Sequence, residues 1–160
     1  MIKARIQIGD GTILDTYEGH KLIYKESDNR TEAPVKKRDA SSYAEKAGEN
    51  TDPRTVQDAF DYKVQFIIET PNNNLENANA VIAAFNRKLY TQAQDSNIRV
   101  FKEVTFYNDF KRVKIVGIPD PIAEPDSFYR RQNGEVMDCA VVSLMIHVSD
   151  PTKCDFNLSV

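Results

Sequence analysis

The side chains best suited to acid, base or nucleophilic chemistry are few in this sequence: two cysteines, Cys139 and Cys154, and two histidines, His20 and His147. Cys139 lies in an apolar run with valine, alanine and methionine, where a thiol behaves as a small hydrophobe and stays inert. His147 lies eight residues further along the same run, about 26 Å away in an extended strand at about 3.3 Å per residue. These two side chains therefore cannot form a catalytic dyad.

Motifs that bind phosphates or metals are also missing from the sequence. Residues 9–11 read Gly-Asp-Gly, but they lack the further glycine and the strand-helix setting of a nucleotide-binding loop and are typical of a turn. No serine stands in the Gly-x-Ser-x-Gly setting of a nucleophile. The acids Asp120, Glu124 and Asp126 lack the regular ligand spacing and central glycine of a calcium loop. We therefore expect no metal, no cofactor and no enzymatic activity.

Composition indicates a single folded domain over residues 1–160, because 41% of the residues are hydrophobic and 28% are charged. The net charge of -3, with lysine and arginine scattered among acids, argues against a nucleic-acid partner. The first residues lack the apolar core of a signal peptide, and no stretch approaches the roughly 18 apolar residues of a membrane span. We expect a soluble cytoplasmic protein with no membrane partner and with reduced thiols, although one bridge between Cys139 and Cys154 stays open.

Period-two alternation of apolar and polar residues predicts most of the secondary structure as strands. It is clearest in residues 61–70, where Tyr62, Val64, Phe66 and Ile68 share one face. It recurs at the N-terminus and in residues 135–148, whose even positions from 140 to 148 are all apolar. We expect turns at 18–20, 108–109 and 133–134, the last two closing antiparallel hairpins. The remaining predicted strands are 12–17, 21–25, 98–107, 112–118 and 128–131.

One amphipathic helix is predicted over residues 74–90. Asn73 can cap it, with Glu76 completing a capping box. Its apolar side chains recur at three- and four-residue spacing, so that one face must pack on a sheet. They are Leu75, Ala78, Ile82, Phe85 and Leu89, with Val81 widening the stripe.

These elements predict an α+β fold, mainly an antiparallel β-sandwich or barrel-like sheet with one amphipathic helix packed on it. Short hairpin connections favour this class over an alternating doubly wound one. The proline-stiffened acidic segment 119–126 is expected to be a solvated connector, because proline disfavours central strands.

Residues 26–54 form a charged stretch with few large apolar side chains, which predicts a polar loop or arm. Pro34, Val35, Lys36 and Lys37 are typical of a short edge strand, since proline and lysine are common edge devices. Tyr43 stands alone in this stretch and either anchors the arm against a neighbouring subunit, folds back on its own domain or remains exposed. Lys36, Lys37 and Tyr43 are the interface residues that we predict.

The strand at 61–69 and the helix ending near Phe85 and Tyr90, followed by residues 106–109 and 114–119, together resemble the N-terminal domain of phage distal tail proteins. The resemblance covers residues 55–150, and what is similar there is the order of the strands and the helix. The resemblance implies a β-sandwich that forms rings with other copies and binds other tail proteins, as related tail-tube subunits do. It also implies a protein that is cytoplasmic in the host before assembly and then part of a virion or phage-like particle. A non-enzymatic ligand- or protein-binding β module is the alternative.

Overall fold

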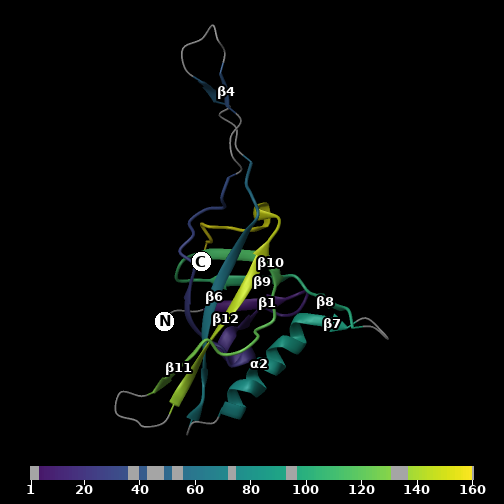
Figure 1. The fold of residues 1–160 in the computed structure, drawn as a ribbon, viewed down its shortest axis with the longest axis vertical. Helices are drawn as coiled ribbons and strands as arrows, with labels where there is room; N and C mark the ends of the chain where they lie inside the picture. The colour runs from purple at the N-terminus through teal and green to yellow at the C-terminus, as the bar shows by residue number, and fades with distance from the viewer. Residues whose placement is uncertain are drawn as a thin grey trace.

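The computed structural model of the chain describes residues 4–35, 40–42, 49–51, 56–71, 75–92, 97–130 and 137–159. Antiparallel strands dominate these residues, and one long helix packs against them, which confirms the α+β fold expected from the sequence (Figure 1). The strands of the main sheet are β1 (Ala4–Ile8), β2 (Leu14–Asp15), β3 (Ile23–Ser27), β6 (Phe60–Glu69), β9 (Val104–Asn108), β10 (Val113–Pro119), β11 (Ser127–Arg130) and β12 (Met137–Val148).

The main sheet has the order β2-β1-β9-β10-β12-β6-β3, with β11 adding to β12. In Figure 1 the β6 and β12 strands run across the β1, β9 and β10 strands, so that the sheet folds into two facing layers. Phe106 of β9 lies between them, with its ring centre 6.4 Å from that of Tyr62 and 6.3 Å from that of Phe66, both on β6. The alternating faces predicted for β6 and β12 are confirmed, because Tyr62 to Ile68 and Ala140 to Val148 are buried at every even position.

The two layers join at a corner where β10 meets β12 through only two register pairs, Ile118 with His147 and Pro119 with Ile146. Gly117 sits at this crossing, and a Cβ atom there would collide with the His147 backbone. Pro119 thus belongs to the end of an interior strand, although we predicted that the proline segment stays outside the sheet. A strand end tolerates proline because few ladder hydrogen bonds are lost there.

The connector after β10 is attached to the sheet. The Asp120 amide donates to the Met145 carbonyl, and the Asp126 amide donates to the Val141 carbonyl. Ile122 between them is buried, and its backbone exchanges two hydrogen bonds with the Asn86 side chain. The expectation of a fully solvated linker was therefore wrong, because this segment fills the edge of β12 between β10 and β11.

A buried polar network ties β3 to the opposite layer. Asn108 is fully buried and donates from Nδ2 to the Tyr24 hydroxyl at 2.8 Å, while its Oδ1 accepts from the Lys111 amide at 2.9 Å. The Tyr62 hydroxyl donates to the Asp28 carbonyl at 2.9 Å and is paired with the Ser27 hydroxyl at 3.0 Å. These bonds satisfy groups that would otherwise be costly to bury.

The long helix α2 (Leu75–Leu89) confirms the predicted helix, and Ala78, Ile82, Phe85 and Leu89 are buried on its inner face. Leu75 is 42% exposed, so its assignment to that face was wrong. Leu75 is the first residue of α2 and lies at the end of the helix. The Asn73 cap lies outside the described residues.

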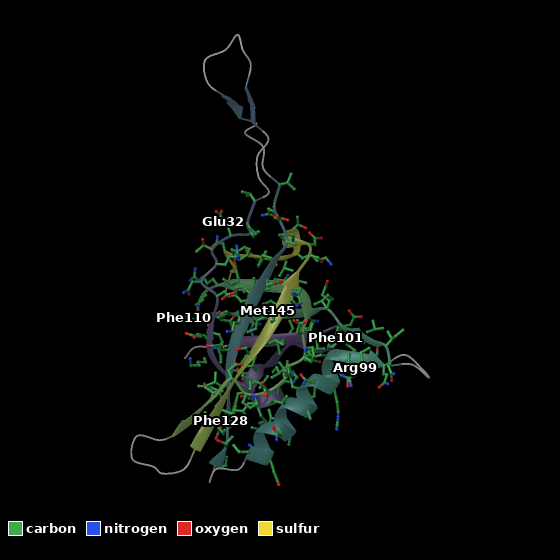
Figure 2. The ribbon with its side chains drawn as sticks, viewed as in Figure 1. Glu32, Arg99, Phe101, Phe110, Phe128 and Met145 are labelled. Atoms are coloured by element: carbon green, nitrogen blue, oxygen red, sulfur yellow. The ribbon has the colours of Figure 1, made fainter. Side chains whose placement is uncertain are left out.

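Four predicted elements differ in the structure. The 12–17 strand is only β2, because the helix α1 (Thr16–His20) follows at once in place of the 18–20 turn. Asp15 caps α1 by accepting the Tyr17 and Glu18 amides. The 98–107 strand is broken at Lys102, whose amide donates to the Leu89 carbonyl. The hairpin turn after β9 spans four residues, and Phe110 within it is exposed and extends neither strand (Figure 2).

Two small hairpins complete the described residues. The β7 strand (Tyr90–Gln92) pairs with β8 (Arg99–Phe101), directly after α2. The β4 strand (Ala40–Ser42) pairs with β5 (Glu49–Thr51) inside the predicted arm. Glu26 and Ser27 belong to β3, and Ser27 and Ala33 are buried, so the first part of residues 26–54 contributes to the sheet and the core. The short segment η2 (Pro151–Lys153) is a 3-10 helix that follows β12.

Candidate functional site

The first candidate site is a histidine held between two carboxylates. His147 lies 2.6 Å from Asp61, measured from Nδ1 to Oδ1, and 2.7 Å from Asp120, measured from Nε2 to Oδ2. All three side chains are partly exposed, with 44% of the His147 side chain open to solvent. We call these three residues the Asp-His-Asp cluster.

Strand register brings the cluster together. Asp61 and His147 are direct partners in the β6–β12 ladder, so that their side chains project from the same face. Asp120 follows the last residue of β10, and its amide bond to the Met145 carbonyl fixes it beside β12. The close approach at Gly117 lets β10 reach this position. The cluster therefore links β6, β12 and the connector across the corner of the sheet.

The two carboxylates raise the pKa of His147, first through the hydrogen bond to Asp61 and then through that to Asp120, while desolvation opposes them weakly. An imidazolium donates from both nitrogens and suits this arrangement, whereas a neutral ring donates from only one. Ser149 lines the same shallow pocket. While the ring is protonated, both nitrogens donate and His147 has no lone pair with which to deprotonate that hydroxyl, so the protonated cluster is suited to holding a proton and not to activating a nucleophile.

Sequence reasoning missed this cluster. It considered His147 only in relation to Cys139, and both residues do lie on the one strand β12. Asp61 and Asp120 are separated from His147 by 86 and 27 positions, so no spacing pattern signals the contact. Within the described ranges, no group of three or more histidine, cysteine or acidic side chains is arranged to hold a metal ion.

His20 has the opposite electrostatic environment. It is buried at the end of α1, with its ring 5.3 Å from that of Phe85 in an edge-on contact. Burial lowers the pKa of His20 to about 4, with a further contribution from the nearby Lys88 cation. The neutral ring accepts at Nδ1 from the Lys88 ammonium 3.3 Å away. His20 therefore packs as a neutral aromatic side chain where the sequence suggested a turn.

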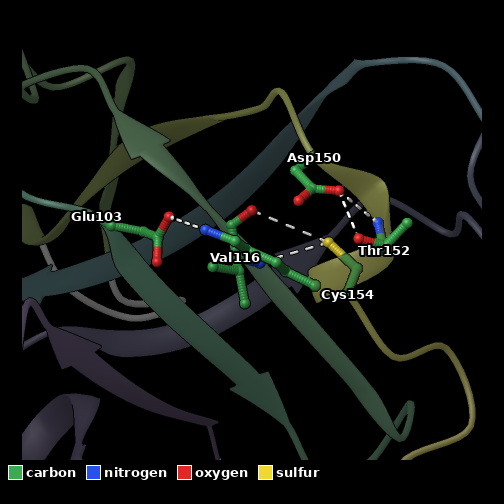
Figure 3. A network of polar contacts seen from close by, with 6 residues as sticks. Glu103, Val116, Asp150, Thr152 and Cys154 are labelled. Carbon is green, nitrogen blue, oxygen red and sulfur yellow. Dashed lines mark hydrogen bonds and ion pairs between the residues drawn. The ribbon is translucent and has the colours of Figure 1, made fainter.

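Neither cysteine forms a disulfide. Cys139 is half-buried on the outer face of β12 opposite Glu69, and so it is less enclosed than the predicted core position. Cys154 directly follows η2, and its sulfur contacts the backbone amide and carbonyl of Val116 (Figure 3). Burial raises the pKa of the Cys154 thiol, which keeps it protonated and unreactive at neutral pH.

The predicted interface residues Lys36, Lys37 and Tyr43 lie outside the described residues. The structure does describe the two ends of the arm. Val35 forms an antiparallel bridge with Gln57, and the Asp58 amide donates to the Pro34 carbonyl at 2.6 Å. Val35 is 52% exposed and Val56 is 60% exposed. We call residues 34–35 and 56–58 the arm stem.

A second hollow lies between α1, the end of β6 and the start of α2. Tyr17, Lys21, Glu69 and Asn77 line it with polar groups, and Pro71 and Val81 are among its apolar neighbours, so that most of its exposed surface is polar. The Tyr17 hydroxyl is hydrogen-bonded to the Glu69 side chain, which raises the pKa of the Tyr17 phenol. The Lys21 ammonium lies 5.3 Å from the centre of the Tyr17 ring.

No family model, curated protein or solved structure matches the chain. No helix in the described part of the chain is long and apolar enough to cross a bilayer.

Proposed function

We propose that the chain is a structural, self-assembling subunit of a phage-type tail, a ring-forming tail or tail-tube component. The observation that carries the proposal is the arm: its stem exposes two valines, and its β4–β5 hairpin pairs with no other described strand. An isolated two-stranded hairpin is marginally stable in water, so it gains most from a surface outside its own sheet.

The chemistry of the arm supports another protein as that surface. Unpaired strand edges offer backbone donors and acceptors that a neighbouring chain can complete. A polar segment can also wrap a large area at low intrinsic stability. The partners proposed are further copies of this chain and other tail proteins, and the small net charge of -3 argues against nucleic acid. The protein is proposed to reside in the host cytoplasm before assembly and in the particle afterwards.

The occupied Asp-His-Asp cluster and the neutral His20 also favour a non-catalytic role, because neither presents a free base to a substrate. The alternative function is a non-enzymatic ligand- or protein-binding β module. The hollow around Tyr17 and Lys21 favours it, since it is a concave surface on which several polar side chains converge beside apolar ones.

Size-exclusion chromatography with light scattering, followed by electron microscopy of the main peak, tests the proposal. We expect closed rings of more than two protomers, because a head-to-tail interface between copies generates a ring when its rotation closes. A strict monomer at high concentration would overturn the ring and leave the binding module. A symmetric dimer would contradict the ring as well, because it buries the same patch on both subunits and closes at two.

A further inference from the structure

The corner between the two layers of the sheet is held by few backbone bonds. Only two register pairs join β10 to β12, whereas ten pairs join β12 to β6. Side-chain contacts at this corner therefore contribute a larger share of its cohesion than they do elsewhere in the sheet. The hydrogen bonds of His147 reach from β12 to Asp61 of β6 and to Asp120 of the connector that follows β10.

Each element around His147 presents a defined set of groups. β6 presents Asp61 opposite the imidazole and Lys63 two residues further along the same face. β10 brings the uncharged Ile118 beside it. The connector brings Asp120, and β12 itself places Met145 and Ser149 on either side. Asp150, which follows, turns its carboxylate to the Thr152 amide and hydroxyl (Figure 3). Two carboxylates, those of Asp61 and Asp120, thus face the imidazole ring. Each accepts a hydrogen bond from one ring nitrogen when the ring is protonated.

We propose that His147 is a proton-operated clasp that ties β6 and the connector to β12 while it is protonated, and that releases Asp120 when it becomes neutral. A neutral imidazole keeps one N–H, and the bond to Asp61 is the one that it retains, because these two residues are fixed opposite each other in the long ladder. Asp120 lies outside that ladder between two prolines and is held otherwise by a single backbone bond to Met145. A bare nitrogen lone pair facing the Asp120 carboxylate is repulsive, so this side opens.

The sign of the pH effect follows from the direction of the shift. The folded protein raises the pKa of His147 above its ordinary value. The clasp is therefore fully closed below the ordinary histidine pKa of about 6.5 and opens as the pH rises through the folded value. This inference concerns the fold of the single chain and does not depend on the proposed function.

Proton NMR of the two histidine rings, with amide hydrogen exchange on the same samples, tests the clasp. We expect His147 to titrate above the ordinary histidine pKa in the full chain, and Asp61→Asn and Asp120→Asn each to lower its pKa. Asp126→Asn is the matched control, because this connector carboxylate bonds to Ser143 and not to the ring. It should leave the His147 titration unchanged.

Hydrogen exchange reports the opening itself. Protection factors, which correct for the intrinsic pH dependence of exchange, should fall at the Asp120 and Ile118 amides as His147 loses its proton. A fall of roughly two- to five-fold is expected from the loss of one exposed ion pair. His147→Gln should show low protection at both pH values. The clasp is overturned if His147 titrates at or below its ordinary value, or if protection at the corner is equal on both sides of its titration.

Discussion

Gly117 of β10 passes so close to His147 of β12 that a Cβ atom on the glycine would lie 2.8 Å from the His147 carbonyl carbon, and closer still to its oxygen. Backbone atoms cannot move aside as a flexible side chain can. The corner of the sheet is therefore built on the absence of a side chain at this position.

We expect Gly117→Ala to destabilise the protein by about 1 to 3 kcal/mol, because the added methyl group forces β10 away from β12. Urea unfolding followed by circular dichroism measures this loss. Gly11→Ala is a graded comparison, since its Cβ would lie 3.1 Å from the Ile8 carbonyl oxygen in an exposed turn. If Gly117→Ala and Gly11→Ala lose the same amount of stability, the corner tolerates a wider spacing between β10 and β12.

The buried face of α2 gives a second prediction. Phe85 is 1% exposed, and Phe85→Ala should cost roughly 3 to 5 kcal/mol, as large-to-small changes in a core do. Leu75→Ala on the same helix should cost less than about 1 kcal/mol, because Leu75 is already 42% exposed. Both are measured by denaturant unfolding. A Phe85 loss as small as that of Leu75 would mean that α2 does not pack as described.

Acid should destabilise the protein through His20. Its folded pKa of about 4 lies below the ordinary value of 6.5, so the unfolded chain binds the proton more readily. Stability from this group is present above pH 6.5 and falls as the pH drops toward 4, by on the order of 2 to 3 kcal/mol. Thermal unfolding of His20→Gln between pH 7 and pH 4 should show a shallower decline than the unchanged protein.

Measuring both histidine variants in one series separates their effects. His147 contributes stability that is lost on raising the pH, opposite in sign to His20. His147→Gln should therefore leave the acid decline caused by His20 in place. If the loss of stability in acid disappears in His147→Gln and persists in His20→Gln, the electrostatic environments of the two histidines are the reverse of those described.

The arm can be removed without cutting the core. Val35 and Gln57 are bridged, so the chain ends on either side of the arm are close together. Replacing residues 36–52 by a short Gly/Ser linker should leave the melting temperature nearly unchanged and should weaken self-association, measured by light scattering. Loss of the fold would show that the deleted residues belong to the core.

A point variant of the arm stem sharpens this test. Val56→Glu places a charge on a side chain that is 60% exposed, which should shift the oligomer toward monomer while stability is retained. Val100→Glu is the control, because Val100 is 56% exposed but lies on the separate β7–β8 hairpin. If both variants have the same oligomeric state as the unchanged protein, the arm stem is not part of the interface.

Local patterns predicted the elements whose signal is contained in a few neighbouring residues. The alternation in β6 and β12 and the stripe on α2 follow from the geometry of strand and helix, and nearly all of those side chains are buried as expected. Even α1 had a local signal, because Asp15 followed by Glu18 three residues later matches a helix start. The strand reading of that segment gave too little weight to the cap.

Tertiary structure decided the features that depend on residues far apart in the sequence. The single long strand predicted at 98–107 is broken because the Lys102 amide bonds to the end of α2, and the neighbouring Glu103 carbonyl accepts from Gly9. His147 meets Asp61 and Asp120 only because the β6–β12 register and the Gly117 crossing place them together. Strand register over such separations is set by the packing of the whole core and not by local spacing, so the sequence determined which faces are apolar and the fold determined which ionisable side chains meet.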